Sequence, residues 1–243
     1  MNSPLSFSDE ERRAVYRAIS QRRDVRSQFL PDPIAPEILA RLLAAAHQAP
    51  SVGFMQPWDF ILIDDVQIRA RVKAVFEQEN ARAAQNYTGD RQDLYLKLKL
   101  EGILESPLNL CVTCDRTRGG PHVLGRNTIL DGDLFSTCLA VQNIWLAARA
   151  EGIGIGWVSI MDAEELARTL NLPENIYPLA YLCLGYVSTF LPEPELQTVG
   201  WRRRLPLETL LHRNSWDQAD AELGELVRQK SGSMPVENQA LQH

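Results

Sequence analysis

The chain has 243 residues, with 25 Lys and Arg against 31 Asp and Glu, which gives a formal net charge of −6. A hydrophobic fraction of 45% is enough for a sizeable core, and the length suits one α/β unit with an extension, given roughly 100–200 residues per domain. The acidic balance argues against nucleic acid as the main partner, so basic clusters in this chain suit a small anionic ligand better.

Residues 1–4 lack the charged-then-apolar pattern of a signal peptide, and no apolar run reaches the length of a membrane span. Four cysteines fall in apolar segments, at Cys111, Cys114, Cys138 and Cys183. The first two have redox or zinc spacing, but no second Cys pair or nearby His pair completes a metal site. We therefore expect buried, reduced thiols in a cytoplasmic protein that binds neither a metal nor a membrane.

The N-terminal part of the chain is predicted to be helical. Ser8 with Glu11 three residues later forms a capping box, and Val15 and Ile19 continue an apolar stripe at helical spacing. The helix leads into a basic cluster at residues 21–26, in which three arginines surround one aspartate. Planar guanidinium groups bind phosphate oxygens bidentately, so the cluster predicts a phosphate clamp. A solvated basic surface is the alternative that the cluster alone leaves open.

A second helix and a ligand-binding loop are predicted next. Pro36 is well placed as a first helical residue, and the helix has to end before Pro50. Residues 49–58 then mix Gly and Pro with one small hydroxyl, so their backbone can approach a flat ligand closely. A strand over residues 59–63 follows. We assign no function to His47, because a lone histidine on a helix is more often structural.

The middle of the chain alternates surface and core segments. We expect a charged surface helix over residues 66–86, a mobile cover over 88–100 and an apolar strand over 108–113. From residue 134 to residue 150 nearly every side chain is apolar or small. A helix that is hydrophobic all round is buried, either in a large core or at a subunit interface. Gly152 ends this helix.

Two further strands and an arm complete the predicted elements. Residues 152–160 carry alternate glycines without the strand-to-helix turn of a dinucleotide fingerprint, which indicates a strand closely approached by another backbone or a ligand ring. Asp162 and Glu165 cap a short helix, and residues 179–187 form another strand. An extended arm then leads from residue 192 to a late arginine triplet. The polar composition from residue 229 to the end predicts disorder.

Four motifs together resemble the FMN-dependent nitroreductase superfamily, over residues 8–211. In chain order they are Arg22-Arg23-x-x-Arg26, Pro50-Ser51-x-Gly53-x-x-Gln56-Pro57-Trp58, Gly152-x-Gly154-x-Gly156-Trp157 and a late Arg-x-Pro-Leu-Glu. Each motif alone is weak, whereas their joint order and spacing are specific. Two positions resemble a narrower branch of this superfamily. Asp24 stands where nitroreductases usually have Ser, and Ser159 directly follows Gly-Trp-Val.

The resemblance implies an α+β fold, with a mixed, mainly antiparallel sheet flanked by helices and built as an intertwined homodimer. It implies a flavin domain over residues 8–213 and a partly disordered extension over 214–243. FMN would lie at the interface between subunits, with its phosphate on Arg22, Arg26 and Arg204. The full set of implied flavin contacts is Arg22, Arg23, Asp24, Val25, Arg26, Pro50, Ser51, Gly53, Leu100, Val158, Ser159 and Arg204.

In the narrower branch FMN is substrate as well as cofactor. The resemblance implies that dioxygen fragments reduced FMN, giving 5,6-dimethylbenzimidazole, the lower base of vitamin B12, and erythrose 4-phosphate. Its implied catalytic residues are Asp24 and Ser159: Asp24 suits the general base that the ribityl carbons require, and Ser159 can orient a peroxide or a proton relay. A separate NAD(P)H-flavin reductase is an implied source of reduced FMN.

Two other functions stay open from the sequence. An NAD(P)H-dependent nitroreductase or a reductive dehalogenase would need an open face over the flavin, whereas flavin fragmentation benefits from a closed pocket. A non-enzymatic flavin-binding protein would leave Asp24 as an ion-pair partner of its arginines and Ser159 as a buried hydroxyl. The products formed from reduced FMN and dioxygen separate these functions.

Overall fold

The computed structural model describes residues 5–231, and residues 1–4 and 232–243 lie outside the described part. The chain divides into two compact units, 1–195 and 196–243, each described here by itself. The expected boundary at 213/214, between a flavin domain and an extension, stays a prediction. The sequence predicted disorder from residue 229 to the end of the chain. This prediction is wrong for residues 229–231, which are the last residues of a helix, and residues 232–243 lie outside the described part.

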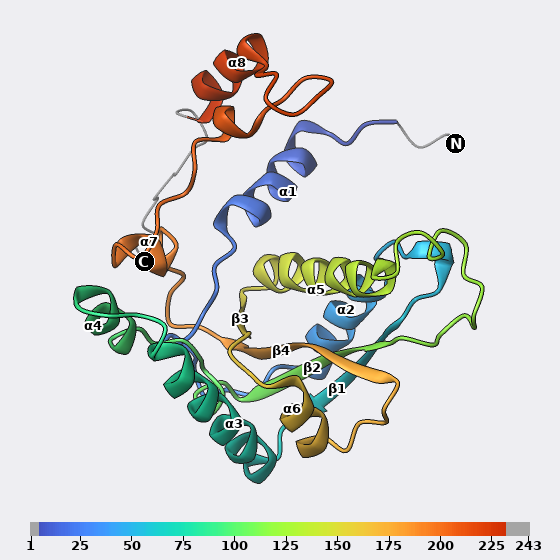
Figure 1. Cartoon of the computed structure of the whole chain (residues 1–243), viewed down its shortest axis with the longest axis vertical. Helices are drawn as coiled ribbons and strands as arrows, with labels where there is room; N and C mark the ends of the chain where they lie inside the picture. The colour runs from blue at the N-terminus through green and yellow to red at the C-terminus, as the bar shows by residue number, and fades with distance from the viewer. Residues whose placement is uncertain (1–4, 232–243) are drawn as a thin grey trace. The chain divides into compact units, whose positions relative to one another are not determined.

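The first unit contains a four-stranded sheet in the order β1-β2-β4-β3, with every neighbouring pair antiparallel (Figure 1). The strands are β1 (Trp58–Ile63), β2 (Leu108–Asp115), β3 (Ile153–Val158) and β4 (Ile176–Tyr186). At the outer edge of β3, Asp24 forms an isolated parallel bridge with Ile155. The sheet is therefore mixed and mainly antiparallel, which confirms the predicted fold class.

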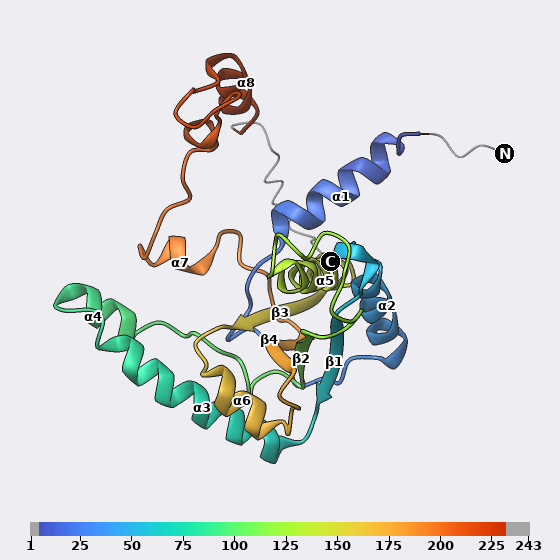
Figure 2. The same ribbon diagram turned by 45° about the vertical axis from the view of Figure 1, so that its right-hand side comes forward.

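Helices cover both faces of the sheet (Figures 1 and 2). One face packs on α2 (Pro36–His47) and α5 (Gly132–Ala150), and the other on α3 (Val66–Ala84) and α6 (Ala163–Thr169). Side chains alternate between the two layers because successive strand residues point to opposite faces. On β4, for example, Leu182 packs in the layer of α2 and α5, and its neighbour Cys183 packs in the layer of α3 and α6.

Local sequence signals set several helix starts. The helix α1 (Asp9–Gln21) begins at the predicted capping box, in which the Glu11 carboxylate accepts the N–H of Ser8 at 2.8 Å. As predicted, Pro36 is the first residue of α2. The segment expected to be a cover contains a helix, α4 (Asp90–Leu96), which packs on α3. Whether α4 covers a flavin stays a prediction.

The two sides of α5 differ in burial. Its inner side is buried against the sheet, as at Ile144, whereas its outer side exposes Phe135, Cys138, Leu139 and Gln142. The prediction that all four thiols are buried is therefore wrong for Cys138, because this residue lies on the outer side of the helix. In the single chain, the outer side of α5 therefore exposes a stripe of apolar side chains. The sequence predicted that this helix is buried either in a large core or at a subunit interface, and a large core is excluded for its outer side.

Short helices follow the sheet. The extended arm expected after residue 192 is interrupted by a one-turn helix, α7 (Glu195–Thr198). The second unit contains η2 (Leu207–Leu210) and α8 (Ala221–Ser231), which pack together, with Arg228 Nε 3.3 Å from Glu208 Oε1. Within residues 5–231, no helix has the length and apolar character needed to cross a membrane.

Candidate active site

The basic cluster docks against the free edge of β3. Val25 donates its N–H to the carbonyl of Ile155 at 3.0 Å, alongside the parallel bridge made by Asp24. This approach is so close that a Cβ atom on Gly156 would overlap the Val25 carbonyl oxygen. The sequence predicted that this glycine-rich strand is closely approached by another backbone or a ligand ring. The backbone that approaches it is that of the arginine cluster, and Gly156 is required for this contact.

Both carboxylate oxygens of Asp24 have partners. Oδ1 accepts the N–H of Trp157 at 2.9 Å, and Oδ2 accepts from Arg26 Nη2 at 2.8 Å. Burial raises the pKa of Asp24, while the Arg26 charge and the Trp157 hydrogen bond limit this rise. The result is a carboxylate with a fixed orientation and an increased proton affinity, the properties of a general base.

The three arginines of the cluster have different environments. Arg26 is buried, and its Nη1 lies 3.5 Å from Glu195 Oε2. Arg23 donates through Nε to the carbonyl of Leu191 at 2.9 Å, so its side chain fixes the chain after β4. The guanidinium of Arg22 stacks on Trp145, with Cζ 4.8 Å from the ring centroid. Sequence reasoning missed Trp145 and Glu195, because both lie more than 100 positions away and no local pattern marks them.

Three other predicted contacts gather beside the cluster. Val158, the last residue of β3, is buried in the same core layer that Leu100 packs against. Ser159, the next residue, is exposed. A Cβ atom on Gly102 would lie 2.7 Å from the Arg26 carbonyl oxygen, so the segment after Leu100 lies against the cluster. The structure thus brings the predicted contacts at 22–26, 100 and 158–159 into one region.

The loop at residues 50–54, which we call the ring-side loop, is held by hydrogen bonds and close packing. The Ser51 hydroxyl accepts the N–H of Gln56 at 3.0 Å, and Val52 donates its N–H to Ser136 Oγ at 3.0 Å. Gly53 has φ +54°, in the region that favours glycine, while Pro50 and Gly53 are exposed. The loop presents an exposed backbone surface at the start of α5.

The ring-side loop and the arginine cluster contact opposite ends of α5 (Figure 1). The loop bonds to Ser136, whereas Trp145 Nε1 donates to the Arg23 carbonyl at 3.2 Å. The two anchors are nine positions apart in α5, which corresponds to ~13 Å along the helix axis. Within one chain, the structure therefore does not bring the predicted contacts at 50–53 together with those at 22–26. Arg204 lies in the second unit, where its N–H donates to Gln197 Oε1 at 3.3 Å.

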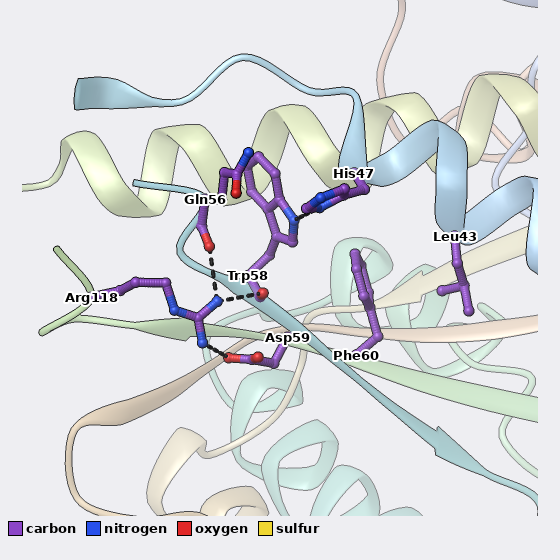
Figure 3. A pocket seen from close by; sticks show the side chains of 7 residues that line it. All are labelled: Leu43, His47, Gln56, Trp58, Asp59, Phe60 and Arg118. Atoms are coloured by element: carbon purple, nitrogen blue, oxygen red, sulfur yellow. Dashed lines mark hydrogen bonds and ion pairs between the residues drawn. The ribbon is translucent and has the colours of Figure 1, made fainter. Parts of the chain in front are cut away.

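A separate open pocket of about 520 Å³ lies at the start of β1 (Figure 3). It is lined by Leu43, His47, Gln56, Trp58, Asp59, Phe60 and Arg118. Its polar groups bond to one another: Arg118 donates to the carbonyls of Gln56 at 2.8 Å and Trp58 at 3.0 Å, and Trp58 Nε1 donates to His47 Nδ1 at 3.1 Å. These contacts fix the end of the Pro50–Trp58 motif, and the pocket includes none of the predicted flavin contacts.

Comparison with known proteins identifies relatives over most of the chain. The model described as "Nitroreductase family" matches residues 19–186. A 5,6-dimethylbenzimidazole synthase of Rhodospirillum rubrum is 44% identical over 185 residues, covering 76% of this chain and 87% of the relative. One from Rhodobacter capsulatus is 39% identical over 204 residues, covering 84% and 98%. A crystal structure of oxidized iodotyrosine deiodinase bound to FMN and 3-iodo-L-tyrosine shares the fold, at 21% identity and TM-score 0.64, covering 83% of this chain and 98% of that one.

Proposed function

The chain belongs to the nitroreductase family, and from this premise we propose that it is a 5,6-dimethylbenzimidazole synthase, an enzyme that uses FMN. Two synthases are similar to most of the chain, at 44% identity over 76% of it and 39% identity over 84% of it. The reaction is the oxidative fragmentation of reduced FMN by dioxygen to 5,6-dimethylbenzimidazole and erythrose 4-phosphate. The alternatives, a nitroreductase, a dehalogenase or a flavin carrier, are not favoured.

The observation that carries this proposal is the geometry of Asp24. Its carboxylate is held between the Trp157 N–H and Arg26, beside the strand end that presents Ser159. Reduced FMN, when bound, supplies the electrons and the ring system that dioxygen breaks down. Asp24 acts as the general base for the ribityl carbons, and Ser159 holds or moves a proton through its hydroxyl. A nitroreductase that only transfers hydride has no comparable need for a carboxylate base.

The arginine cluster fits the phosphate of FMN. Within residues 5–231, Nε of Arg26 is buried and has no hydrogen-bond partner, although a buried donor of this kind normally has one. A phosphate oxygen would satisfy it, and the half-buried guanidinium of Arg22 would add a second charge. Arg204, in the second unit, stays a contact of this phosphate that the family resemblance alone implies. Arg23 and Val25 complete this group near the ribityl chain and the polar edge of the ring.

The separation of the ring-side loop from the arginine cluster supports a homodimer in which both subunits contact each flavin. Pro50, Ser51 and Gly53 of one subunit would contact the ring, and Leu100, Val158 and Ser159 would approach it together with the cluster. The family resemblance of the sequence implies the same arrangement, an intertwined homodimer. The exposed apolar stripe on the outer side of α5 is the kind of surface that a second copy covers.

The proposal also covers the source of reduced FMN and the location of the protein in the cell. A separate NAD(P)H-flavin reductase supplies reduced FMN, because this chain is assigned the oxygen-dependent step. We place the protein in the cytoplasm, where thiols such as the exposed Cys138 stay reduced.

The proposed function is tested by mixing purified protein with reduced FMN in air and separating the small molecules by chromatography. Formation of 5,6-dimethylbenzimidazole with permanent loss of flavin supports the synthase. Return of intact oxidised FMN with hydrogen peroxide, without any benzimidazole, would overturn it.

A further inference from the structure

A fully buried carboxylate, Asp133, lies in the first turn of α5, and the mechanism above does not use it. The residue is 0% exposed, and its Oδ1 accepts the N–H of Leu134 at 2.8 Å. An ionised carboxylate removed from water is costly unless cations or hydrogen-bond donors surround it. The N-terminal end of a helix offers a partial positive charge, which is too small to compensate a full negative charge alone.

Two arginines supply opposite charge to Asp133 Oδ2 by ion pairing, without hydrogen-bond geometry, and both come from the β2–α5 loop, defined as residues 116–131. Arg126 Nη2 lies 2.9 Å and Arg116 Nε 3.2 Å from Asp133 Oδ2. This loop of 16 residues contains no helix or strand, so its course depends on such anchors. Asp133 thus ties two distant points of the loop to the start of α5.

The β2–α5 loop interlocks with the ring-side loop. A Cβ atom on Gly53 would lie 2.5 Å from Val123 Cγ1 and 2.9 Å from the Leu124 carbonyl oxygen. In return, a Cβ atom on Gly125 would lie 3.2 Å from Val52 Cγ2. The two loops therefore approach each other so closely that only glycine fits between them, and a displacement of one loop would be transmitted to the other.

We propose that Asp133 is a positioning residue for flavin binding, which acts by fixing the β2–α5 loop and through it the backbone of the ring-side loop. The inference rests on the proposed function, which places the ring-side loop at the flavin ring. It adds that the ring half of the site depends on a charge cluster, Asp133 with Arg116 and Arg126, whose residues are not among the predicted flavin contacts. The phosphate half, at Arg22 and Arg26, is independent of this cluster.

The test is the variant Asp133→Asn, which keeps the size of the side chain and removes its charge. Its matched control is Asp131→Asn, because Asp131 is exposed and also pairs with Arg116, at 3.1 Å. Anaerobic fluorescence titrations would give dissociation constants for reduced FMN and reduced riboflavin, and competition would give the constant for inorganic phosphate. For Asp133→Asn we expect about tenfold weaker binding of both flavins, a change of ~1.4 kcal/mol, and unchanged phosphate binding. The control should match the wild type in all three.

Equal weakening of flavin and phosphate binding, or wild-type affinity for all three ligands, would overturn the inference. If Asp133→Asn does not fold, Arg126→Gln tests the same link, because it removes one of the two cations and keeps the carboxylate paired with Arg116. Failure of both variants to fold would also overturn the inference, since Asp133 would then serve the fold as a whole. A wild type that binds FMN without forming product would overturn the proposed synthase and leave the binding comparison intact.

Discussion

Asp24 has a role in both the fold and the proposed chemistry. The contact of Oδ1 with the Trp157 N–H joins the arginine cluster to β3, and the contact of Oδ2 with Arg26 neutralises a buried cation. A purely structural ion pair would need both contacts and nothing more. The two roles differ in what happens when the negative charge is removed while the hydrogen bond from the Trp157 N–H remains possible.

Asp24→Asn should bind FMN with nearly wild-type affinity and form product about 10²–10⁴-fold more slowly, the range typical of a lost general base. The amide keeps the size of the side chain, and its single oxygen can still accept the Trp157 N–H, whereas its NH2 group cannot accept from Arg26. Anaerobic titration and product quantification measure the two effects separately. Asp59→Asn is the matched control, because Asp59 is an exposed carboxylate that pairs with Arg118 at 2.6 Å. If Asp24→Asn forms product at the wild-type rate, Asp24 is not the general base and has only a structural role.

The pH dependence of product formation should show the raised pKa of Asp24. Burial raises this pKa above its ordinary value of 3.8, so the carboxylate takes up a proton at a higher pH than an exposed aspartate does. The base is lost on protonation, and kcat/KM should therefore fall as the pH is lowered through a midpoint above 3.8. Circular dichroism over the same range would show that the protein stays folded. A rate that stays constant down to pH 3.8 would contradict Asp24 as the base.

Single residues were predictable from the sequence where the signal is local. The capping box at Ser8 and the helix start at Pro36 are confirmed, because each depends on neighbours within four positions. The burial of Cys138 was predicted wrongly, because a uniformly apolar helix does not reveal which side faces the sheet. The Trp157 partner of Asp24 lies 133 positions away, and no short-range pattern encodes that pairing.

Among the elements, β3 determines where the arginine cluster lies. Its glycines remove the side chains that would otherwise keep the cluster away from the strand edge, as Gly156 does for the Val25 carbonyl. The sequence predicted the strand and a close approach to it, without identifying what approaches. It also missed α7, because four residues are too few to give a helical period.

Gly156→Ala should displace residues 24–26 from β3, and so weaken FMN binding and lower the stability by about 1–3 kcal/mol, as overpacking does. Urea unfolding and an FMN titration would measure the two effects. Gly224→Ala in α8 is the control, because its Cβ would lie at an ordinary 3.6 Å from Glu208 Cβ. Unchanged FMN affinity in Gly156→Ala would contradict the proposed dependence of the phosphate clamp on this contact.

At the scale of the whole molecule, we propose a flavin site that is built from two chains. The ring-side loop and the arginine cluster contact opposite ends of α5, and the outer side of that helix is apolar and exposed in the single chain. The resemblance of the sequence to its family implied the homodimer. The α5 anchors now supply a physical reason for it, which sequence patterns could not give because they do not place two distant loops in space.

Leu139→Lys should convert the protein to a monomer and remove flavin binding with it, because a charge would replace an apolar contact in the centre of the stripe. Light scattering and an FMN titration of the same sample would show both losses. Tyr177→Lys is the control, since Tyr177 has similar exposure, 44% against 46% for Leu139, and lies on the strand β4 rather than on α5. A stable wild-type monomer that binds FMN would contradict the two-chain site.

The most direct test of the proposed function follows the fate of the flavin itself. Wild-type protein, Asp24→Asn and a protein-free control would each receive the same excess of reduced FMN in air, and chromatography would quantify FMN and 5,6-dimethylbenzimidazole over several turnovers. For the wild type we expect one benzimidazole formed for each FMN permanently lost, with erythrose 4-phosphate in equal amount. The two controls should return oxidised FMN. Full recovery of intact FMN from the wild type, with no benzimidazole above the protein-free control, would contradict the synthase assignment.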